Sequence, residues 1–277
     1  MSATRKLPAS RRTAIEQVTS GSTAPGSPKR AAKPPPLATT PRALAESAMQ
    51  LLRAQQRPPK DDPAAGGYGT ALEHLGLHVP ELREVTRHVS REVKRWPAEP
   101  VLELVRRLID TDTFEGRQLA YEVLGRHRAA REALDAEMLE ELAQGMDNWV
   151  TVDTLAAEVV GRAWANGQID DRTVKAWARA DDFWWRRLAL ASAVALNTPA
   201  RGGTGDAERT FMLCHLLVAD REDMVVKALS WALRSVIAHD ARRVRAFLAE
   251  HDAELAPRVR REVSAKLRTG LKSGRRR

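Results

Sequence analysis

The sequence contains one cysteine, Cys214, and few large aromatic residues apart from tryptophan. A single cysteine excludes an intrachain disulfide and a zinc site of paired cysteines, and it suits a reducing compartment, so we expect a cytoplasmic protein. No apolar stretch approaches the roughly 20 residues that span a bilayer, and we expect no membrane association. The basic N-terminus lacks the apolar core of a secretory signal. An organellar transit peptide remains an alternative to a plain basic tail.

Motifs of several enzyme classes are also missing. The chain has no phosphate-binding GxxxxGK[ST] or GxGxxG loop and no nucleophile elbow. It lacks the helix-hairpin-helix glycine signature that precedes a catalytic lysine, so a Schiff-base lyase step is not expected. His74 and His78 have the spacing of helical metal ligands, but Gly76 and Pro80 interrupt a helix there and no third ligand lies near. We expect no metal ion and no cofactor.

The excess of basic residues lies at the two ends of the chain. Of the formal net charge of +9, residues 1–42 contribute +7 and residues 266–277 contribute +6, which leaves −4 for residues 43–265. The total charge therefore says nothing about the folded part. A contact with nucleic acid there has to come from a local basic face.

Composition divides the chain into one domain and two tails. Residues 1–40 hold six of the fifteen prolines and show no hydrophobic periodicity, so we predict a disordered basic tail. Residues 41–268 are assigned to a single domain. Residues 269–277 form a basic C-terminal tail.

The domain has the pattern of an all-α protein. A first helix is expected over about 41–56, with Thr40 as N-cap and Pro41 at its first position, followed by a loop. From Pro80 onward, apolar residues recur at three- and four-residue spacing, and no stretch alternates as a strand would. Further N-caps are expected at Asn148, Asp170, Asp181 and Asp240. The expected helices cover about 80–95, 98–110, 114–130, 135–145, 149–165, 171–179, 182–197, 205–219, 223–239, 241–250 and 256–268.

These helices form a repeat. The segments FEGRQLAYEVL (114–124) and FWWRRLALASAV (183–194) share aromatic, arginine and Leu-Ala positions. Comparable helices recur at intervals of about 35–45 residues. This period is typical of HEAT-type helical repeats, which stack into a curved solenoid. The second helix of each pair lines the concave face, so polar residues on these helices should converge on one groove.

Four residues interrupt the apolar faces of three such second helices: Trp149, Asp153, Arg187 and Trp231. Trp149 and Asp153 share one helix face, and Asp153 lies near the helix N-terminus, where the dipole favours a carboxylate. Each residue also has a plainer structural interpretation. The tryptophans could pack in the core, as we expect of Trp96, Trp164 and Trp177. Asp153 could be a solvent-exposed helix-end carboxylate, and Arg187 could pair with Asp181 or Asp182.

The segments that hold these residues resemble the AlkD-type DNA alkylation repair glycosylases. The matching pattern is a Trp with an Asp four residues on, in NWVTVDTLAAEVVGRAW (148–164), then W-x-x-R-x-A-[IL] in DFWWRRLALASAVAL (182–196), then K-A-[IL]-x-W-x-L-R in VVKALSWALRSV (225–236). An earlier segment, LGLHVPELR (75–83), is similar to the start of the family's first long helix. The resemblance spans roughly residues 43–265.

The resemblance implies a HEAT-like solenoid with a concave DNA-binding groove, acting as a monomer on double-stranded DNA. The catalytic residues would be Asp153, Trp149 and Trp231, with Asp153 and the two indoles facing the sugar. Arg187 would contact the DNA backbone beside the lesion. Further DNA contacts are expected at Lys227, Arg234 and Tyr68. Asp223, Met224 and Ser230 depart from the family pattern near the second tryptophan.

The function implied is a monofunctional glycosylase that hydrolyses the N-glycosidic bond of cationic N3- or N7-alkylated purines. The resemblance also implies that the damaged base is not flipped out of the helix. Two alternatives are a catalytically silent DNA-binding relative and a HEAT-type protein scaffold. A scaffold should show exposed apolar stripes along the groove in place of the Trp, Asp, Arg and Trp set.

Overall fold

A computed structural model describes residues 39–57 and 69–272 of the chain. Most of the two predicted tails, and Tyr68, lie outside these described residues. The elements in chain order are α1 (Pro41–Arg53), α2 (Val79–Glu92), η1 (Val93–Arg95), α3 (Ala98–Ile109), α4 (Phe114–Arg126), α5 (Arg128–Glu132), α6 (Ala136–Ala143), α7 (Trp149–Leu155), η2 (Ala156–Val160), α8 (Gly161–Ala165), α9 (Asp171–Trp177), α10 (Phe183–Leu196), η3 (Pro199–Arg201), α11 (Ala207–Leu216), α12 (Asp223–Glu250) and α13 (Pro257–Thr269).

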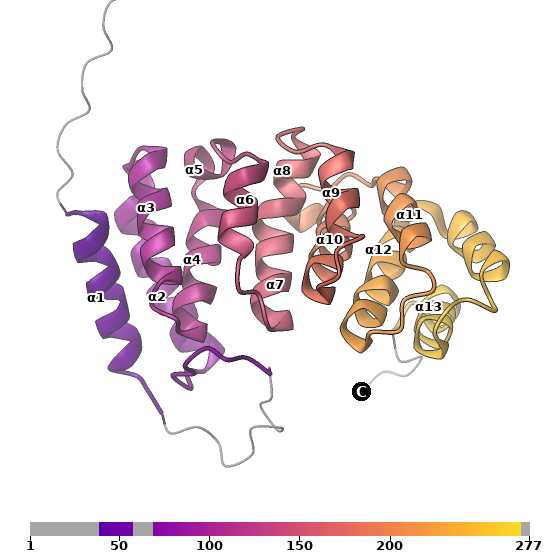
Figure 1. The fold of residues 1–277 in the computed structure, drawn as a ribbon, viewed down its shortest axis with the longest axis horizontal. Coiled ribbons are helices and arrows are strands. Elements are labelled where there is room, and N and C mark those ends of the chain that lie inside the picture. The colour runs from indigo at the N-terminus through magenta and orange to yellow at the C-terminus, as the bar shows by residue number, and fades with distance from the viewer. Residues whose placement is uncertain (1–38, 58–68, 273–277) are drawn as a thin grey trace, which may run out of the picture. The chain divides into compact units, whose positions relative to one another are not determined.

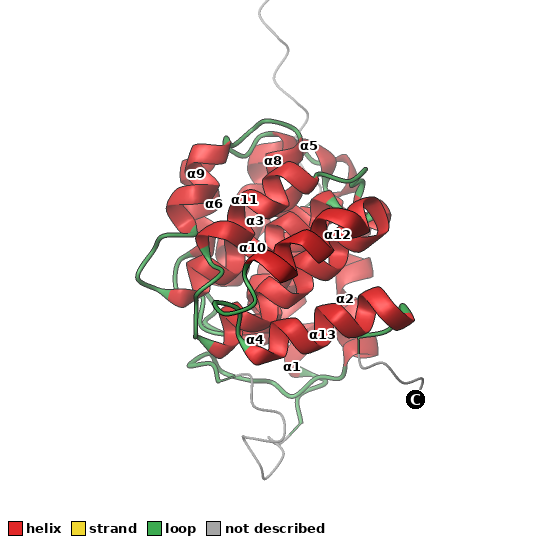
Figure 2. Ribbon diagram, turned by 90° about the vertical axis from the view of Figure 1, so that its right-hand side faces the viewer, coloured by secondary structure: helices red, strands yellow, loops and turns green. Residues whose placement is uncertain are grey.

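The fold is the predicted all-α helical-repeat solenoid. Helices α4, α7, α10 and α12, here called the inner helices, pack on one another in succession. Helices α2 and α3 pack against α4, α9 and α11 against α10, and α11 and α13 against α12. Figure 1 shows the helices following one another from α1 to α13, and Figure 2 shows the same stack end-on. Within the described ranges no β-strand occurs, and one isolated bridge pairs Glu73 with Thr113.

The hydrophobic core extends through the whole stack. One cluster of buried side chains runs from Leu44 on α1 to Val263 on α13. Trp164 and Tyr121 are its largest fully buried members. Since each repeat buries its apolar face only against its neighbours, the inner helices hold one another in place, and with them the polar residues that they carry.

Most of the predicted helix starts are confirmed by hydrogen bonds. The side chains of Thr40, Asn148 and Asp170 accept from backbone N–H groups in the first turns of α1, α7 and α9. Asp240 has non-helical backbone angles within α12 and accepts from Arg243 N at 2.9 Å, so the predicted break there is present. The predicted cap at Asp181 is wrong. Its neighbour Asp182 caps α10 by accepting from Trp184 N.

The predicted helix over 149–165 contains a wide π turn at its centre. Residues Ala156–Val160 form this turn between α7 and α8. Just beyond it, the backbone of Gly161 lies so close to α10 that a Cβ would clash with Ala195 and approach the Ser192 carbonyl to 2.6 Å. The π turn and this close approach bring the helix of Asp153 against the helix of Arg187. π turns of this kind are often found beside functional residues.

Candidate functional site

Asp153 and Arg187 form a two-pronged ion pair between α7 and α10. Arg187 Nε donates to Asp153 Oδ1 at 2.9 Å, and Nη2 donates to Oδ2 at 2.8 Å. The remaining nitrogen, Nη1, donates to the backbone carbonyl of Met224 on α12 at 2.6 Å. One guanidinium group therefore links three successive inner helices and holds both oxygens of the carboxylate. Paired parallel bonds of this kind fix orientation as well as charge.

The pair is largely withdrawn from water. Arg187 is 5% exposed, and the Asp153 side chain is 17% exposed. The interpretation of Asp153 as a solvent-exposed helix-end carboxylate is therefore wrong. The pairing of Arg187 with Asp181 or Asp182 is wrong as well, because Arg187 pairs with Asp153. The adjacent Arg186 donates to the backbone carbonyl of Asp181 and forms an ion pair with Asp220.

Burial raises the pKa of the Asp153 carboxyl above its usual value, because the charged form loses hydration. The positive charge of Arg187 and its hydrogen bonds oppose this rise, and the charge of Arg201 adds a smaller effect in the same sense. As the pH falls, Asp153 takes up a proton at a higher pH than an exposed aspartate does.

Two adjoining depressions open beside this pair. They have volumes of about 450 and 500 Å³, and Trp149, Asp153 and Trp231 line both of them. Trp149 is the first residue of α7 and is 40% exposed, whereas Trp231 on α12 is half-buried. The structure thus brings three of the four singled-out side chains to one place on the inner helices, with Arg187 behind the carboxylate and lining the second depression.

The other tryptophans lie elsewhere. Trp96, Trp164 and Trp177 are buried, as predicted. Trp185 packs against Trp177 with ring centroids 5.7 Å apart, and Trp184 against Phe183 at 4.7 Å. Neither Trp184 nor Trp185 lines the two depressions beside Asp153.

Lys227 and Arg234 line the second depression, but each has an intramolecular partner. Lys227 Nζ lies 2.6 Å from Asp223 Oδ2, and Arg234 Nη2 lies 3.8 Å from Glu262 Oε2. The Lys227 side chain is 37% exposed and that of Arg234 is 15% exposed. Lys227 is therefore the more accessible cation on this side of the site.

The residues that depart from the family pattern have structural partners here. Met224 supplies the carbonyl that accepts from Arg187. The Ser230 hydroxyl donates to Glu262 Oε2 at 2.7 Å. Asp223 pairs with Lys227. These changes are therefore built into the packing around the ion pair and do not remove any of the four singled-out side chains.

The first depression also includes residues that the sequence did not single out. Arg201, on the η3 segment, lies 3.2 Å from Glu158 Oε1, and both line the depression with Arg83 and Arg126. Glu158 belongs to the π turn, and Arg201 to an irregular connection. Neither position follows from helical periodicity. Only the proximity of Glu158 to Asp153 along the chain could have drawn attention to it.

A family model for DNA alkylation repair enzymes matches residues 48–267. The chain belongs to this family. The match covers all the inner helices that carry the site and agrees with the resemblance seen in the motifs. It supports an enzyme with a role in DNA repair, and DNA as its substrate. Comparison with curated proteins gave no significant match.

Within residues 39–57 and 69–272, the helices of this DNA alkylation repair protein are all too short or too polar to cross a bilayer. The same described residues contain no group of three or more His, Cys, Asp or Glu side chains placed to hold a metal ion.

We expect Arg187→Met to destabilise the protein strongly, because it leaves the Asp153 carboxylate buried without its cation. Breaking one side of a buried ion pair costs about 3–5 kcal/mol, and the partial exposure of Asp153 favours the lower end of this range. The double variant Asp153→Leu/Arg187→Met removes both charges and should be more stable than the single variant. Urea unfolding measures both. A single variant as stable as the unmodified protein would contradict this account of the pair.

Proposed function

We propose that the protein is a monofunctional DNA glycosylase that hydrolyses the N-glycosidic bond of purines alkylated at N3 or N7. The observation that supports this most directly is the Asp153 carboxylate, which Arg187 holds beside two depressions that Trp149 and Trp231 also line. All of these residues come from one chain. We therefore propose a monomer that acts on double-stranded DNA.

The chemistry requires little of the enzyme at the leaving group. The bond between sugar C1′ and the purine nitrogen breaks with both electrons going to the base. A purine alkylated at N3 or N7 carries a positive charge and leaves as a neutral molecule, so no general acid is needed. Positive charge develops on the sugar instead. Water then adds to C1′ and releases its proton to the surrounding solvent, which leaves an abasic site.

The side chains around Asp153 suit the stabilisation of that positive sugar. A fixed carboxylate and the faces of two indole rings attract a developing cation, and their effect is larger where water is excluded. In this proposal Asp153, Trp149 and Trp231 contact the sugar. Asp153 also orients the attacking water, since each carboxylate oxygen accepts one bond from Arg187 and retains a second lone-pair direction.

Arg187 is better placed to position Asp153 than to bind phosphate. Three of its nitrogens donate to Asp153 and Met224, and it is 5% exposed. We therefore propose Arg187 as a positioning residue. Phosphate contacts beside the lesion then fall to Lys227, with Arg234 in support. A contact from Tyr68 stays a prediction.

The shape of the site supports catalysis without base flipping. The carboxylate and the indoles border open depressions on the inner helices, and this arrangement suits approach from the sugar side while the base stays stacked. Enzymes that flip bases instead enclose the base in a closely fitting pocket.

Asp153→Asn is the decisive variant because it removes the charge of the carboxylate with little change in its shape. It also leaves the buried Arg187 without its anion, so it lowers the stability of the protein, and the control variant Asp220→Asn does the same to Arg186. We expect single-turnover release of 7-methylguanine from duplex DNA to slow by about 10²–10³, or roughly 3–4 kcal/mol, the usual cost of losing one preorganised electrostatic partner. DNA binding should hold or tighten, since a negative charge is removed. The assay measures released base at saturating enzyme.

Asp220→Asn is a matched control. Asp220 is also a mostly buried carboxylate paired with an arginine of α10, at 2.9 Å, but it lines neither depression beside Asp153. This variant should release base at the rate of the unmodified protein. If Asp153→Asn also stays within threefold while both variants bind DNA, the catalytic role of Asp153 is refuted. If the unmodified protein binds DNA and releases no base, it is a DNA-binding relative without activity.

The pH dependence of base release gives a separate prediction. Because burial raises the pKa of Asp153, its protonation on acidification begins at a higher pH than for an exposed aspartate. Only the ionised form stabilises the sugar cation. The enzymatic rate should therefore fall on the acid side, with an apparent pKa above the ordinary aspartate value of about 3.9. Asp153→Asn should lack this fall. A rate that is flat to below pH 4, after subtraction of spontaneous depurination, would contradict the assignment.

A further inference from the structure

Helix α2 carries a row of exposed cations that the proposed catalytic site does not use. Arg83, Arg87 and Arg91 follow one another at four-residue spacing, and Lys94 continues the row in η1. Residues three and four apart share a face of a helix, so the four side chains lie along one side of α2. Leu82, Val85, Val89 and Val93 bury a neighbouring side of the same segment in the core.

The row borders one carboxylate of its own helix, Glu84, and the nearby Arg126 is paired with Glu122 at 3.2 Å. No ion pair joins Arg83, Arg87, Arg91 or Lys94 to a carboxylate among residues 39–57 and 69–272. The Nε groups of Arg87 and Arg91 donate only to backbone carbonyls one turn earlier, at 3.3 Å. Like charges at this spacing on a helix repel, which costs a few tenths of a kcal/mol per pair in isolated helices. The row therefore favours an anionic partner.

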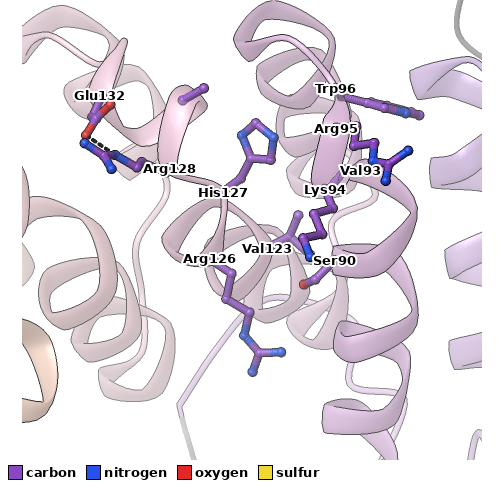
Figure 3. A pocket seen from close by; sticks show the side chains of 11 residues that line it. Ser90, Val93, Lys94, Arg95, Trp96, Val123, Arg126, His127, Arg128 and Glu132 are labelled. Atoms are coloured by element: carbon purple, nitrogen blue, oxygen red, sulfur yellow. Dashed lines mark hydrogen bonds and ion pairs between the residues drawn. The ribbon is translucent and has the colours of Figure 1, made fainter.

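The row borders two further depressions, of about 580 and 540 Å³, between α2 and the end of α4. Ser90, Lys94 and Arg126 line both. In Figure 3, Lys94 and Ser90 lie on one side of this space, with Arg126 and His127 on the other. The Ser90 hydroxyl is buried and has no hydrogen-bond partner among the described residues.

These depressions continue the proposed catalytic groove. Arg126 lines both of them and also lines the depression that contains Trp149, Asp153 and Trp231. Arg83, the first residue of the row, lines that same catalytic depression. Arg87, Arg91 and Lys94 then lead away from it along α2. A ligand that occupies the catalytic depression can therefore extend directly onto the row.

We propose that this α2 ridge (Arg83, Arg87, Arg91 and Lys94, with Arg126 beside it) binds consecutive backbone phosphates of duplex DNA on one side of the lesion. From Arg83 to Lys94 the helix rises by about 16 Å. DNA rises by about 3.4 Å of its axis for each base pair, so the ridge is as long as about five base pairs of the axis. Because each strand winds around that axis, the ridge faces only the few phosphates on the side of the duplex that it contacts. Phosphates carry no sequence information, and the ridge thus holds undamaged flanking DNA as well as damaged DNA.

The inference rests on the proposed function for its choice of DNA over another polyanion. The ridge adjoins the depression that contains Asp153 through the lining residues Arg83 and Arg126, and the proposed substrate of that depression is duplex DNA. An acidic protein would satisfy the same charges, but it would compete with DNA at the shared residue Arg83.

The triple variant Arg87→Gln/Arg91→Gln/Lys94→Gln tests the ridge on the full-length protein. Each substitution removes one charge at an exposed position and keeps a good helix former. We expect at least about tenfold weaker binding to undamaged duplex DNA near 0.1 M salt. The slope of log K against log salt concentration should become shallower by about 3, since each lost phosphate contact accounts for about 0.9. Base release at saturating enzyme should stay within twofold.

The variant Arg172→Gln/Lys175→Gln/Arg179→Gln is the matched control. It removes three cations of the same spacing from α9 and the turn after it, which form no ion pair within the described ranges and line none of the four depressions. This control should change the salt slope by less than one. The proposal that the ridge binds DNA would be overturned if the ridge variant and the unmodified protein had equal salt slopes. It would also be overturned if the two triple variants changed the salt slope equally. A shallower slope confined to the ridge variant in a protein that releases no base would support the ridge and refute the glycosylase.

Discussion

The ion pair between Asp153 and Arg187 is the interaction on which the rest of the site depends. It joins α7 to α10, and the further bond to the Met224 carbonyl adds α12, so one guanidinium ties three inner helices together. A buried pair contributes little net stability compared with apolar packing, but losing either partner is costly. The arrangement therefore fixes the direction of a carboxylate more than it strengthens the fold, which is what an electrostatic catalyst needs.

Charge is arranged locally in this protein. Residues 43–265 have a net charge of −4, yet the depressions on the inner helices are bordered by Arg83, Arg126 and Lys227. Carboxylates are present there too, and most of them form an ion pair with a nearby cation. Glu158 pairs with Arg201, and Asp223 pairs with Lys227. A negative group can thus face the sugar in a surface that still attracts phosphates. The cations of α2, which form no ion pair among the described residues, lie next to this region, and in our proposal they extend the DNA-binding surface beyond it.

Much of the fold could be predicted from local patterns, because helix caps and apolar periodicity depend on neighbours in sequence. Thr40, Asn148 and the break at Asp240 are examples. The π turn at Ala156–Val160 could not, since an α-helical pattern continues through it. The motifs brought Trp149, Asp153 and Trp231 together correctly. The partner of Arg187 was missed because the two residues lie 34 positions apart, and only the stacking of repeats makes them neighbours.

The central claim is that a fixed carboxylate and two indoles act on a sugar whose departing base is already cationic, without a general acid. The most direct test compares single-turnover base release from two duplexes of one sequence, one with 7-methylguanine and one with the neutral lesion hypoxanthine. The account predicts that the unmodified protein releases 7-methylguanine rapidly. It predicts that the unmodified protein releases hypoxanthine no faster than the Asp153→Asn variant releases hypoxanthine. Comparable release of both bases would show that the enzyme protonates its leaving group and would contradict the account.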